Sequence, residues 1–336
     1  MTYTSRIVSV VGATGNQGSG VVAVLLDSTD YVVRAVSSNP TSDKAKSLLS
    51  RHSKYVDEGR FTVVEGNLND RASLEAAIKG SYGLFASFSP TPSEGPIEEN
   101  PEVVQGKNLV DAAKAVGIQH FLYSSLPSAA KLSGGKLTDI FPFEAKAAVE
   151  KYARREFEQK STFLIPGGFF NNLNMPVWAR RREDGVFAIT SPLGRDVKLG
   201  WLDEGYDMGR FAAAVFAKGT SVTAGKTYPV NSKPVTSQEL ADTYTKVTGE
   251  PSTVDPLELE TVSRLLTPHV GETFSNALTS MFHLLNSAEP SPYTYGPGYI
   301  EKDTSFEDLG VKASTPEEFF TRTGWKAAPA ARRPSA

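Results

Sequence analysis

The stretch 7-IVSVVGATGNQGSGVVAVLLDS-28 decides the fold. Three glycines, Gly12, Gly15 and Gly18, stand between an apolar run that reads as a buried strand and a second apolar stretch that reads as a helix. At such a turn Gly12 permits a sharp bend, Gly15 leaves the backbone open to a ligand, and Gly18 lets the helix pack closely. The spacing G-x-x-G-x-x-G therefore predicts a turn that holds a dinucleotide pyrophosphate at a helix N-terminus.

Strand and helix patterns alternate after this turn. Further apolar runs stand at 31–36, 61–66, 83–88 and 120–125. They are too apolar for a sheet with one wet face, so they indicate parallel strands covered on both sides. Between them, 71–79 and 102–116 have helix caps at Asp70 and Asn100. The pattern predicts an α/β protein with a Rossmann-type, doubly wound parallel sheet.

The alternation ends near Lys160, which suggests three parts of the chain. We expect an NAD(P)-binding Rossmann domain over 4–160, a smaller α/β lobe for a substrate or partner over 161–326, and a flexible tail over 327–336. The second lobe should return in part to the main sheet. Two long loops, 89–100 and 126–143, leave carboxyl ends of strands, where open α/β sheets bind their ligands.

The composition of the chain argues against several classes of protein. The net charge of −3 gives no reason to expect direct binding of nucleic acid. The absence of cysteine excludes disulfides and thiolate chemistry, and the four scattered histidines show no metal spacing, so no metal site is expected. No apolar run has membrane-spanning length, and no charged-then-apolar leader precedes Ile7. The expected place is the cytoplasm, with the nucleus as an alternative, and no membrane contact.

The end of the second expected strand bears on the choice of nucleotide. An acid there favours the ribose 2′-hydroxyl of NAD, and an arginine favours the 2′-phosphate of NADP. Here Ser37 and Ser38 take these positions, with Lys44 and Lys46 nearby, while Arg34 lies inside the strand. Without the carboxylate that rejects a phosphate, the sequence favours NADP(H) over NAD(H).

An ordered set of short motifs accompanies the glycine turn: 66-GNLND-70, 124-SSL-126, 143-FEAK-146, 167-GGFFNN-172 and 207-DMGRF-211. With these motifs the chain resembles the NmrA-like family of atypical short-chain dehydrogenase/reductases, and its fungal members most. The resemblance extends from about Arg6 to Trp325. It implies a Rossmann domain that binds NAD(P) and a small C-terminal lobe.

By position, the resemblance also implies a set of binding residues. The pyrophosphate would be held by Gly12, Thr14, Gly15, Asn16, Gln17 and Gly18. Asn67 and Leu68 would lie along the adenine, Lys146 would reach the nicotinamide ribose, and Phe169 and Asn172 would line the substrate cleft, although an aromatic core and a turn would also explain the last two. Two departures stand out: Ser38 replaces a frequent arginine, and Asn67 replaces the usual acid.

The catalytic apparatus of the superfamily is incomplete here. Short-chain reductases place a catalytic Tyr four residues before the Lys, one helical turn away. If Lys146 is that lysine, the Tyr is replaced by Pro142, while Ser125, or Ser124 beside it, stands where the catalytic Ser would be. Lys146 would then transfer the proton itself, as in isoflavone-reductase-like enzymes, or it would only bind the ribose. A third interpretation makes it a surface residue of the helix 143–158.

Two functions follow from these alternatives. The first is an NAD(P)H-dependent oxidoreductase that acts on a small carbonyl or enone, with Lys146 and Ser125 as catalytic candidates. The second is a non-catalytic, dinucleotide-binding redox sensor that regulates a transcription factor or another protein partner. Both functions require the glycine turn.

We predict that Gly15→Val abolishes binding of NAD(P), because its side chain would occupy the space of the pyrophosphate. Isothermal titration calorimetry of the variant with NADP⁺ and NAD⁺ measures this. Undiminished affinity would contradict the assignment of the glycine turn.

Overall fold

The computed structural model describes residues 6–93, 95–157, 159–289 and 291–327. Its main sheet has seven strands in the order β3-β2-β1-β4-β5-β6-β11, and all neighbouring pairs are parallel. The strands are β1 (Ile7–Val11), β2 (Val32–Ser37), β3 (Phe61–Glu65), β4 (Gly83–Ala86), β5 (His120–Ser124), β6 (Ser161–Pro166) and β11 (Thr227–Val230). The Rossmann-type sheet is confirmed, and its strand order reverses between β1 and β4, which opens a crevice there.

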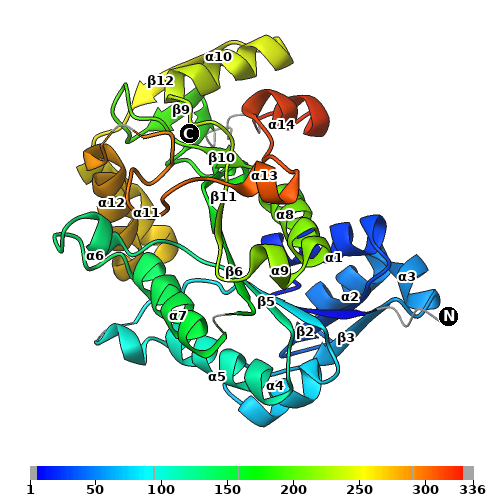
Figure 1. The fold of residues 1–336 in the computed structure, drawn as a ribbon. Coiled ribbons are helices and arrows are strands. Elements are labelled where there is room, and N and C mark those ends of the chain that lie inside the picture. The colour runs from blue at the N-terminus through cyan, green and yellow to red at the C-terminus, as the bar shows by residue number, and fades with distance from the viewer. Residues whose placement is uncertain (1–5, 94, 158, 290, 328–336) are drawn as a thin grey trace.

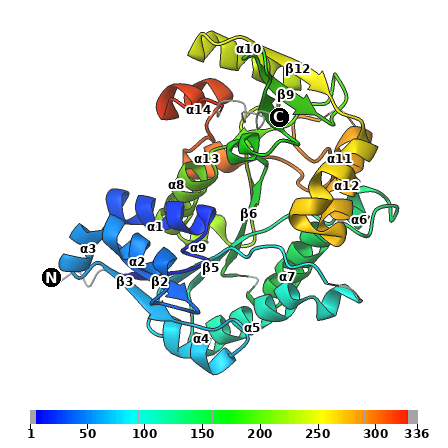
Figure 2. The ribbon, with the colours of Figure 1, turned by 180° about the vertical axis from the view of Figure 1, so that it is seen from behind.

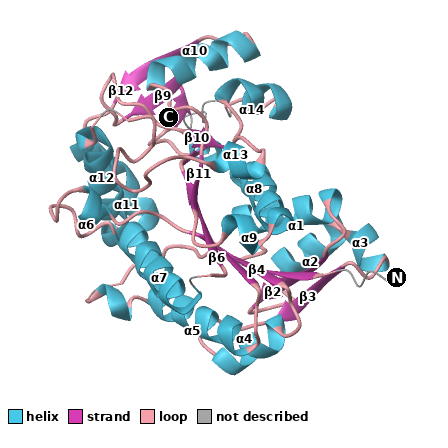
Figure 3. Cartoon of the chain, viewed as in Figure 1, coloured by secondary structure: helices cyan, strands magenta, loops and turns pink. Residues whose placement is uncertain are grey.

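Helices cover both faces of this sheet (Figures 1 and 3). One face carries α1 (Asn16–Ser28), α2 (Asp43–Arg51) and α8 (Glu204–Lys218), and the other carries α4 (Arg71–Ile78), α5 (Pro101–Ala115) and α7 (Phe141–Phe157). Short helices occupy the connections: α3 (Ser53–Asp57), η1 (Ile97–Glu99), α6 (Ala129–Leu132) and α9 (Thr220–Thr223). Each face buries its own apolar cluster, so the strands are dry on both sides.

The second half of the chain builds a smaller unit and also completes the main sheet. Its own sheet joins β8 (Ala179–Arg181), β9 (Phe187–Ser191) and β12 (Ser252–Pro256), next to a short pair of β7 (Gly168–Phe169) and β10 (Trp201–Leu202). Around them lie η2 (Phe170–Asn174), α10 (Ser237–Thr248), α11 (Leu259–Val270), α12 (Glu272–Ser287), α13 (Ser305–Leu309) and α14 (Pro316–Thr323). In Figures 1 and 2, α11 and α12 lie beside α6. Of the tail predicted over 327–336, only Ala327 is described.

Helix α8 of the second half packs directly on α1, the helix of the glycine turn. A Cβ atom at Gly20 would lie 2.1 Å from the carbonyl oxygen of Gly205, and one at Gly209 would lie 2.7 Å from that of Gly20. The two backbones are therefore in contact, which only glycine allows at these positions. This close packing fixes the second half relative to the nucleotide turn.

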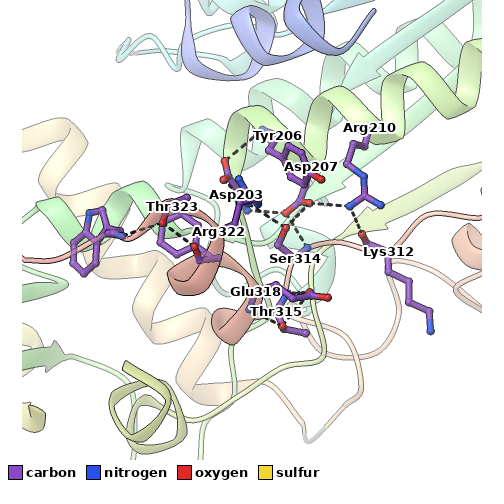
Figure 4. Close-up of polar contacts among 12 residues, drawn as sticks. Asp203, Tyr206, Asp207, Arg210, Lys312, Ser314, Thr315, Glu318, Arg322 and Thr323 are labelled. Atoms are coloured by element: carbon purple, nitrogen blue, oxygen red, sulfur yellow. Dashed lines mark hydrogen bonds and ion pairs between the residues drawn. The ribbon is translucent and has the colours of Figure 1, made fainter. Parts of the chain in front are cut away.

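A buried carboxylate fastens the C-terminal segment to α8 (Figure 4). Asp207 is fully buried and accepts hydrogen bonds from the backbone N–H of Asp203 (2.8 Å) and of Ser314 (3.0 Å), and from the Ser314 hydroxyl (2.9 Å). Burial raises the pKa of Asp207, and these hydrogen bonds oppose the rise. Arg322 of α14 reaches Asp203 at 2.8 Å, so two contacts hold the segment in place.

His120 is a buried titratable group at the opposite, amino end of the sheet. Its Nε2 lies 3.2 Å from the hydroxyl of Thr162 and 3.1 Å from that of Thr223. Its Nδ1 has no hydrogen-bond partner among the described residues. Burial lowers the pKa of His120 to about 4.

This shift predicts that acid destabilises the protein. The unfolded chain takes up a proton on His120 near pH 6.5, whereas the folded chain resists until about pH 4. A contribution of up to about 3 kcal/mol, fully present above pH 6.5, is therefore lost as the pH falls through this window. Urea unfolding of wild type and His120→Gln over this range measures it, with the exposed His269→Gln as control. The dependence of the free energy of unfolding on pH should become weaker in His120→Gln only. Parallel curves of this free energy against pH for all three proteins would contradict the prediction.

Candidate functional site

A cleft of about 920 Å³ opens at the carboxyl edge of the main sheet. It runs from the glycine turn after β1, past the ends of β2, β4 and β5, to helices α11 and α12 of the second half. Both loops singled out from the sequence contribute to its wall, the first with Ser89–Thr91 and the second with Leu126, Ile140, Pro142 and Phe143. The position agrees with the crevice that the strand order creates.

Glycine is needed at each of the three positions of the turn for a different physical reason. Gly12 has φ +79°, and its Cβ atom would lie 2.3 Å from the carbonyl oxygen of Ser87. A Cβ atom at Gly18 would lie 2.2 Å from the Gly12 carbonyl oxygen, so Gly18 permits the close packing of helix on strand. Gly15 is exposed in the cleft wall, where a Cβ atom would meet only the Gly12 oxygen at 3.3 Å. Gly18 itself is buried and does not line the cleft.

The start of α1 is suited to an anionic ligand. Gly15 is the N-cap in an extended conformation, and no described side chain caps the first turn, which contains no acid. Free amides and the positive end of the helix dipole attract phosphate. The side-chain oxygen of Gln17 is buried and has no partner within the described ranges. The free amides and the helix dipole fit a dinucleotide pyrophosphate, whereas the Gln17 oxygen is an acceptor that fits a donor group; Thr14, Gly15, Asn16 and Gln17 all line the cleft.

Asn16 connects the glycine turn to the second half of the chain. Its side-chain amide donates a 3.0 Å hydrogen bond to the carboxylate of Glu204, the first residue of α8. Burial raises the pKa of Glu204, and the bond from Asn16 opposes the rise. Since this side chain is engaged with α8, the backbone N–H of Asn16 is the group left for a phosphate.

The residues expected at the adenosine end lie together. Ser37, Ser38, Lys44, Asn67 and Leu68 all line the cleft. The Lys44 side chain is exposed and has no ion-pair partner in the described part of the chain.

Two other cations of this region are not part of the cleft. Arg34 donates to the carbonyl oxygens of Ala77 and Lys79 at 2.9 Å each, so its role is structural. Lys46 is exposed and does not line the cleft.

Lys146 is placed in the middle of the cleft by α7. The side chain is buried, and its Nζ donates to the carbonyl oxygen of Phe88 (2.9 Å) and to Glu102 (2.5 Å). Its interpretation as a surface lysine is therefore wrong. Of the two candidate serines, Ser124 lines the cleft, whereas Ser125 is fully buried and donates to the backbone oxygens of Leu126 and Lys146 at 3.4 Å. Ser124 and Lys146 thus both line the cleft, whereas Ser125 does not and contacts Lys146 only through its backbone oxygen.

The position of the superfamily tyrosine is apolar in this protein. Pro142 and Phe143 both line the cleft, and the ring of Phe143 packs edge-on against Tyr295, with 5.4 Å between ring centroids. The Tyr295 hydroxyl donates to the carbonyl oxygen of Pro166 at 2.7 Å, and burial raises its pKa. Since its proton is engaged and poorly acidic, Tyr295 is a poor proton donor to a ligand in the cleft.

The far end of the cleft is almost entirely apolar, and we call it the apolar chamber. Its wall combines aromatic and aliphatic side chains that come from the second half, except for Phe143 of α7: Phe143, Phe169, Val177, Trp178, Leu266, Phe274, Leu278, Met281, Phe282, Leu285 and Tyr295. The charged residues that line the cleft, Lys44, Lys146 and Glu204, lie at the nucleotide end or beside it, so the described wall of the chamber has none. Asn172 also lines the cleft.

Helices α11 and α12 were missing from the sequence prediction, although they line one side of the apolar chamber. Their apolar residues recur with helical spacing: Val262, Leu266 and Val270 in α11, and Leu278, Phe282 and Leu285 in α12. This period was the available signal for the two helices. Nothing local indicated that the pair would face the nucleotide turn.

Two further searches cover the described residues only. None of their helices is both long enough and apolar enough to cross a membrane. No group of three His, Cys, Asp or Glu side chains within these ranges is arranged to hold a metal ion.

The fold and the cleft define a class of dinucleotide-binding proteins, and comparisons identify the family. The model of the NmrA-like family matches residues 4–320, so the chain belongs to the NmrA-like family. The resemblance seen in the sequence motifs is thus confirmed.

Among similar sequences is the NmrA-like family domain-containing oxidoreductase malD of Malbranchea aurantiaca, 29% identical over 260 residues, which are 73% of this chain and 74% of that protein. The oxidoreductase himF of Aspergillus japonicus is 28% identical over 323 residues, 89% of this chain and 88% of its own. Among solved structures, the negative transcriptional regulator NmrA in complex with NAD has a TM-score of 0.76 at 20% identity, over 95% of both chains. Its complex with NADP has a TM-score of 0.75 at 20% identity, again over 95% of both chains. At this identity the structures show a shared fold.

Proposed function

We propose that this protein is an NAD(P)H-dependent oxidoreductase that reduces a carbonyl or conjugated double bond on a bulky, uncharged, largely apolar molecule. One observation carries the proposal: a single cleft joins the glycine turn, Lys146 and the apolar chamber. A wall of this composition suits a substrate pocket, because apolar lining with a few polar groups binds and orients small molecules. Similarity to the oxidoreductases malD and himF supports the same function.

The sequence predicted a small acceptor, whereas the volume and the apolar lining of the cleft favour a bulkier molecule. An unpaired charge would lose its hydration in the chamber without gaining a partner, which disfavours charged acceptors. A ligand with aromatic or aliphatic rings would gain from contact with Trp178, Phe282 and their neighbours.

The chain's own groups have separate roles in this proposal. Bound NAD(P)H supplies a hydride. Lys146 offers an ammonium N–H to the ribose or to the developing negative charge of the acceptor, and the apolar walls keep bulk water away. Asn172 gives the chamber one polar contact that orients the substrate.

We also propose a preference for NADP(H). Ser37 and Ser38 provide hydroxyl donors, neither of these two positions is an acid, and the exposed Lys44 lines the same cleft. A cation there attracts the additional 2′-phosphate.

The alternative function is a redox sensor that controls a protein partner. It is supported by similarity to NmrA, whose structures describe a negative transcriptional regulator that binds NAD and NADP. An apolar chamber beside Lys146 has no evident use in a pure sensor, which is why we place the oxidoreductase first.

Lys44 tests the nucleotide preference. We expect Lys44→Ala to weaken NADPH binding about tenfold, or about 1.4 kcal/mol, and to leave NADH binding unchanged. Lys46→Ala, which removes a nearby lysine outside the cleft, is the matched control. Quenching of protein fluorescence by each nucleotide gives the affinities. Equal losses for NADPH and NADH in Lys44→Ala would count against a phosphate contact.

The chamber tests the reaction. Consumption of NADPH, followed by its absorbance, should be faster with an uncharged two-ring quinone or aryl enone than with its carboxylated analogue, by about tenfold or more. Leu278→Asp, which puts a charge into the chamber, should remove this activity and leave NADPH binding intact, while Leu265→Asp on the exposed side of α11 should retain both.

If no acceptor consumes NADPH and NADP⁺ binds about tenfold more tightly than NADPH, the redox sensor is the better function. Equal activity of Leu278→Asp and wild type would place the reaction outside the chamber.

A further inference from the structure

Two elements supply acceptors to the ammonium group of Lys146, which comes from α7: Phe88 follows β4, and Glu102 lies in the first turn of α5. Glu102 Oε1 accepts from Lys146 Nζ at 2.5 Å, and the Phe88 carbonyl oxygen accepts at 2.9 Å. Lys146 and Phe88 both line the cleft, whereas Glu102 lies behind its wall and is not part of the lining.

The number of N–H donors on Lys146 determines how many of them remain for a ligand. An ammonium group has three N–H donors and no acceptor. Two of the donors are engaged by Glu102 and Phe88, so one remains for a ligand in the cleft. A free lysine side chain has several rotatable bonds and would lose this freedom on binding a ligand, whereas Lys146 has lost it on folding.

Glu102 lies in a buried environment that destabilises a charged carboxylate. It is fully buried, and its second oxygen, Oε2, has no hydrogen-bond partner in the described structure. Burial raises the pKa of Glu102, and the ammonium of Lys146 opposes the rise. The neighbouring hydroxyl of Tyr123 in β5 is also buried, and its interaction with the Glu102 carboxylate opposes the rise of the Glu102 pKa as well. An apolar residue at position 102 would stabilise the folded protein at least as well as the ion pair between Glu102 and Lys146. Stability alone therefore does not explain this ion pair.

The loop before α5 is built to hold Glu102 in position. The side-chain oxygen of Asn100 accepts from the Glu102 backbone N–H at 2.9 Å, and its amide donates to Thr91 and to Ser93 at 2.9 and 2.8 Å. Pro101 occupies the first turn of the helix. The loop that starts in the cleft wall at Ser89 thus ends by fixing the carboxylate.

We propose that Glu102 is a positioning residue that acts on bound nucleotide through Lys146. It holds the ammonium so that its remaining N–H is preorganised for a ligand in the cleft. The consequence for turnover rests on the proposed oxidoreductase function, whereas the consequence for nucleotide affinity does not, so the two are tested separately.

A double-mutant cycle on NADPH affinity tests the inference. We expect Glu102→Ala to raise the Kd for NADPH about tenfold in the wild-type background, because Lys146 becomes mobile. In the Lys146→Met background the same change should alter the Kd less than about twofold, since the residue through which Glu102 acts is gone. Glu99→Ala removes an exposed carboxylate from the preceding loop and is the matched control, expected to be neutral.

Glu102→Gln distinguishes positioning from a purely structural role. Its amide oxygen still accepts from Lys146, so we expect an intermediate Kd, and it keeps the shape of the site if Glu102→Ala does not fold. Thermal unfolding of every variant shows that the folded protein is being titrated. Equal losses of affinity with and without Lys146, or no loss in the wild-type background, would overturn the proposal. Loss of acceptor reduction with unchanged Kd values would overturn it too, while an inactive wild type with the expected cycle would refute only the oxidoreductase.

Discussion

The carbonyl oxygen of Gly12 lies so close to the first turn of α1 that no side chain fits between them. A Cβ atom at Gly18 would come within 2.2 Å of it, and one at Gly12 within 2.3 Å of the Ser87 oxygen. This contact between backbones fixes where α1 starts and directs its free amides toward the carboxyl edge of the sheet. The nucleotide end of the cleft follows from that one constraint, because the adjacent strands β2 and β4 end at the same edge.

The second constraint joins the two halves of the chain. Gly20 and Gly205 bring α8 onto α1, and the bond from Asn16 to Glu204 ties the same helix to the glycine turn. Helix α8 also binds the C-terminal segment, because Asp207 accepts hydrogen bonds from Ser314. The apolar chamber is formed mainly by elements of the second half, together with Phe143 of α7. The chamber and the glycine turn therefore share one cleft although their residues come from distant parts of the chain.

The centre of the cleft offers few polar groups beside Lys146. Pro142 and Phe143 continue the apolar wall there, and the Tyr295 hydroxyl is engaged by a backbone oxygen. Lys146 is left as the ionisable group beside the chamber, and it is bound to a fully buried carboxylate. A buried ion pair contributes little net stability, so its value lies in the geometry that it imposes on Lys146.

The sequence by itself determined those features that short-range patterns encode. The first five strands, helices α4 and α5 and the glycine turn follow from apolar runs, caps and glycine spacing, and the structure places them within about two residues of the predicted bounds. The residues of the nucleotide end were also accessible, because they directly follow strands that the pattern reveals.

Only the tertiary structure decided the rest. Glu102 looked like an ordinary acid in a first helical turn, and its partner lies 44 residues away. Whether Ser124 or Ser125 faces the cleft, and that α11 and α12 roof a chamber, depend on how whole elements pack against one another. Periodicity shows that a helix has an apolar face, but the partner of that face is set by contacts distant in sequence, which no local pattern contains.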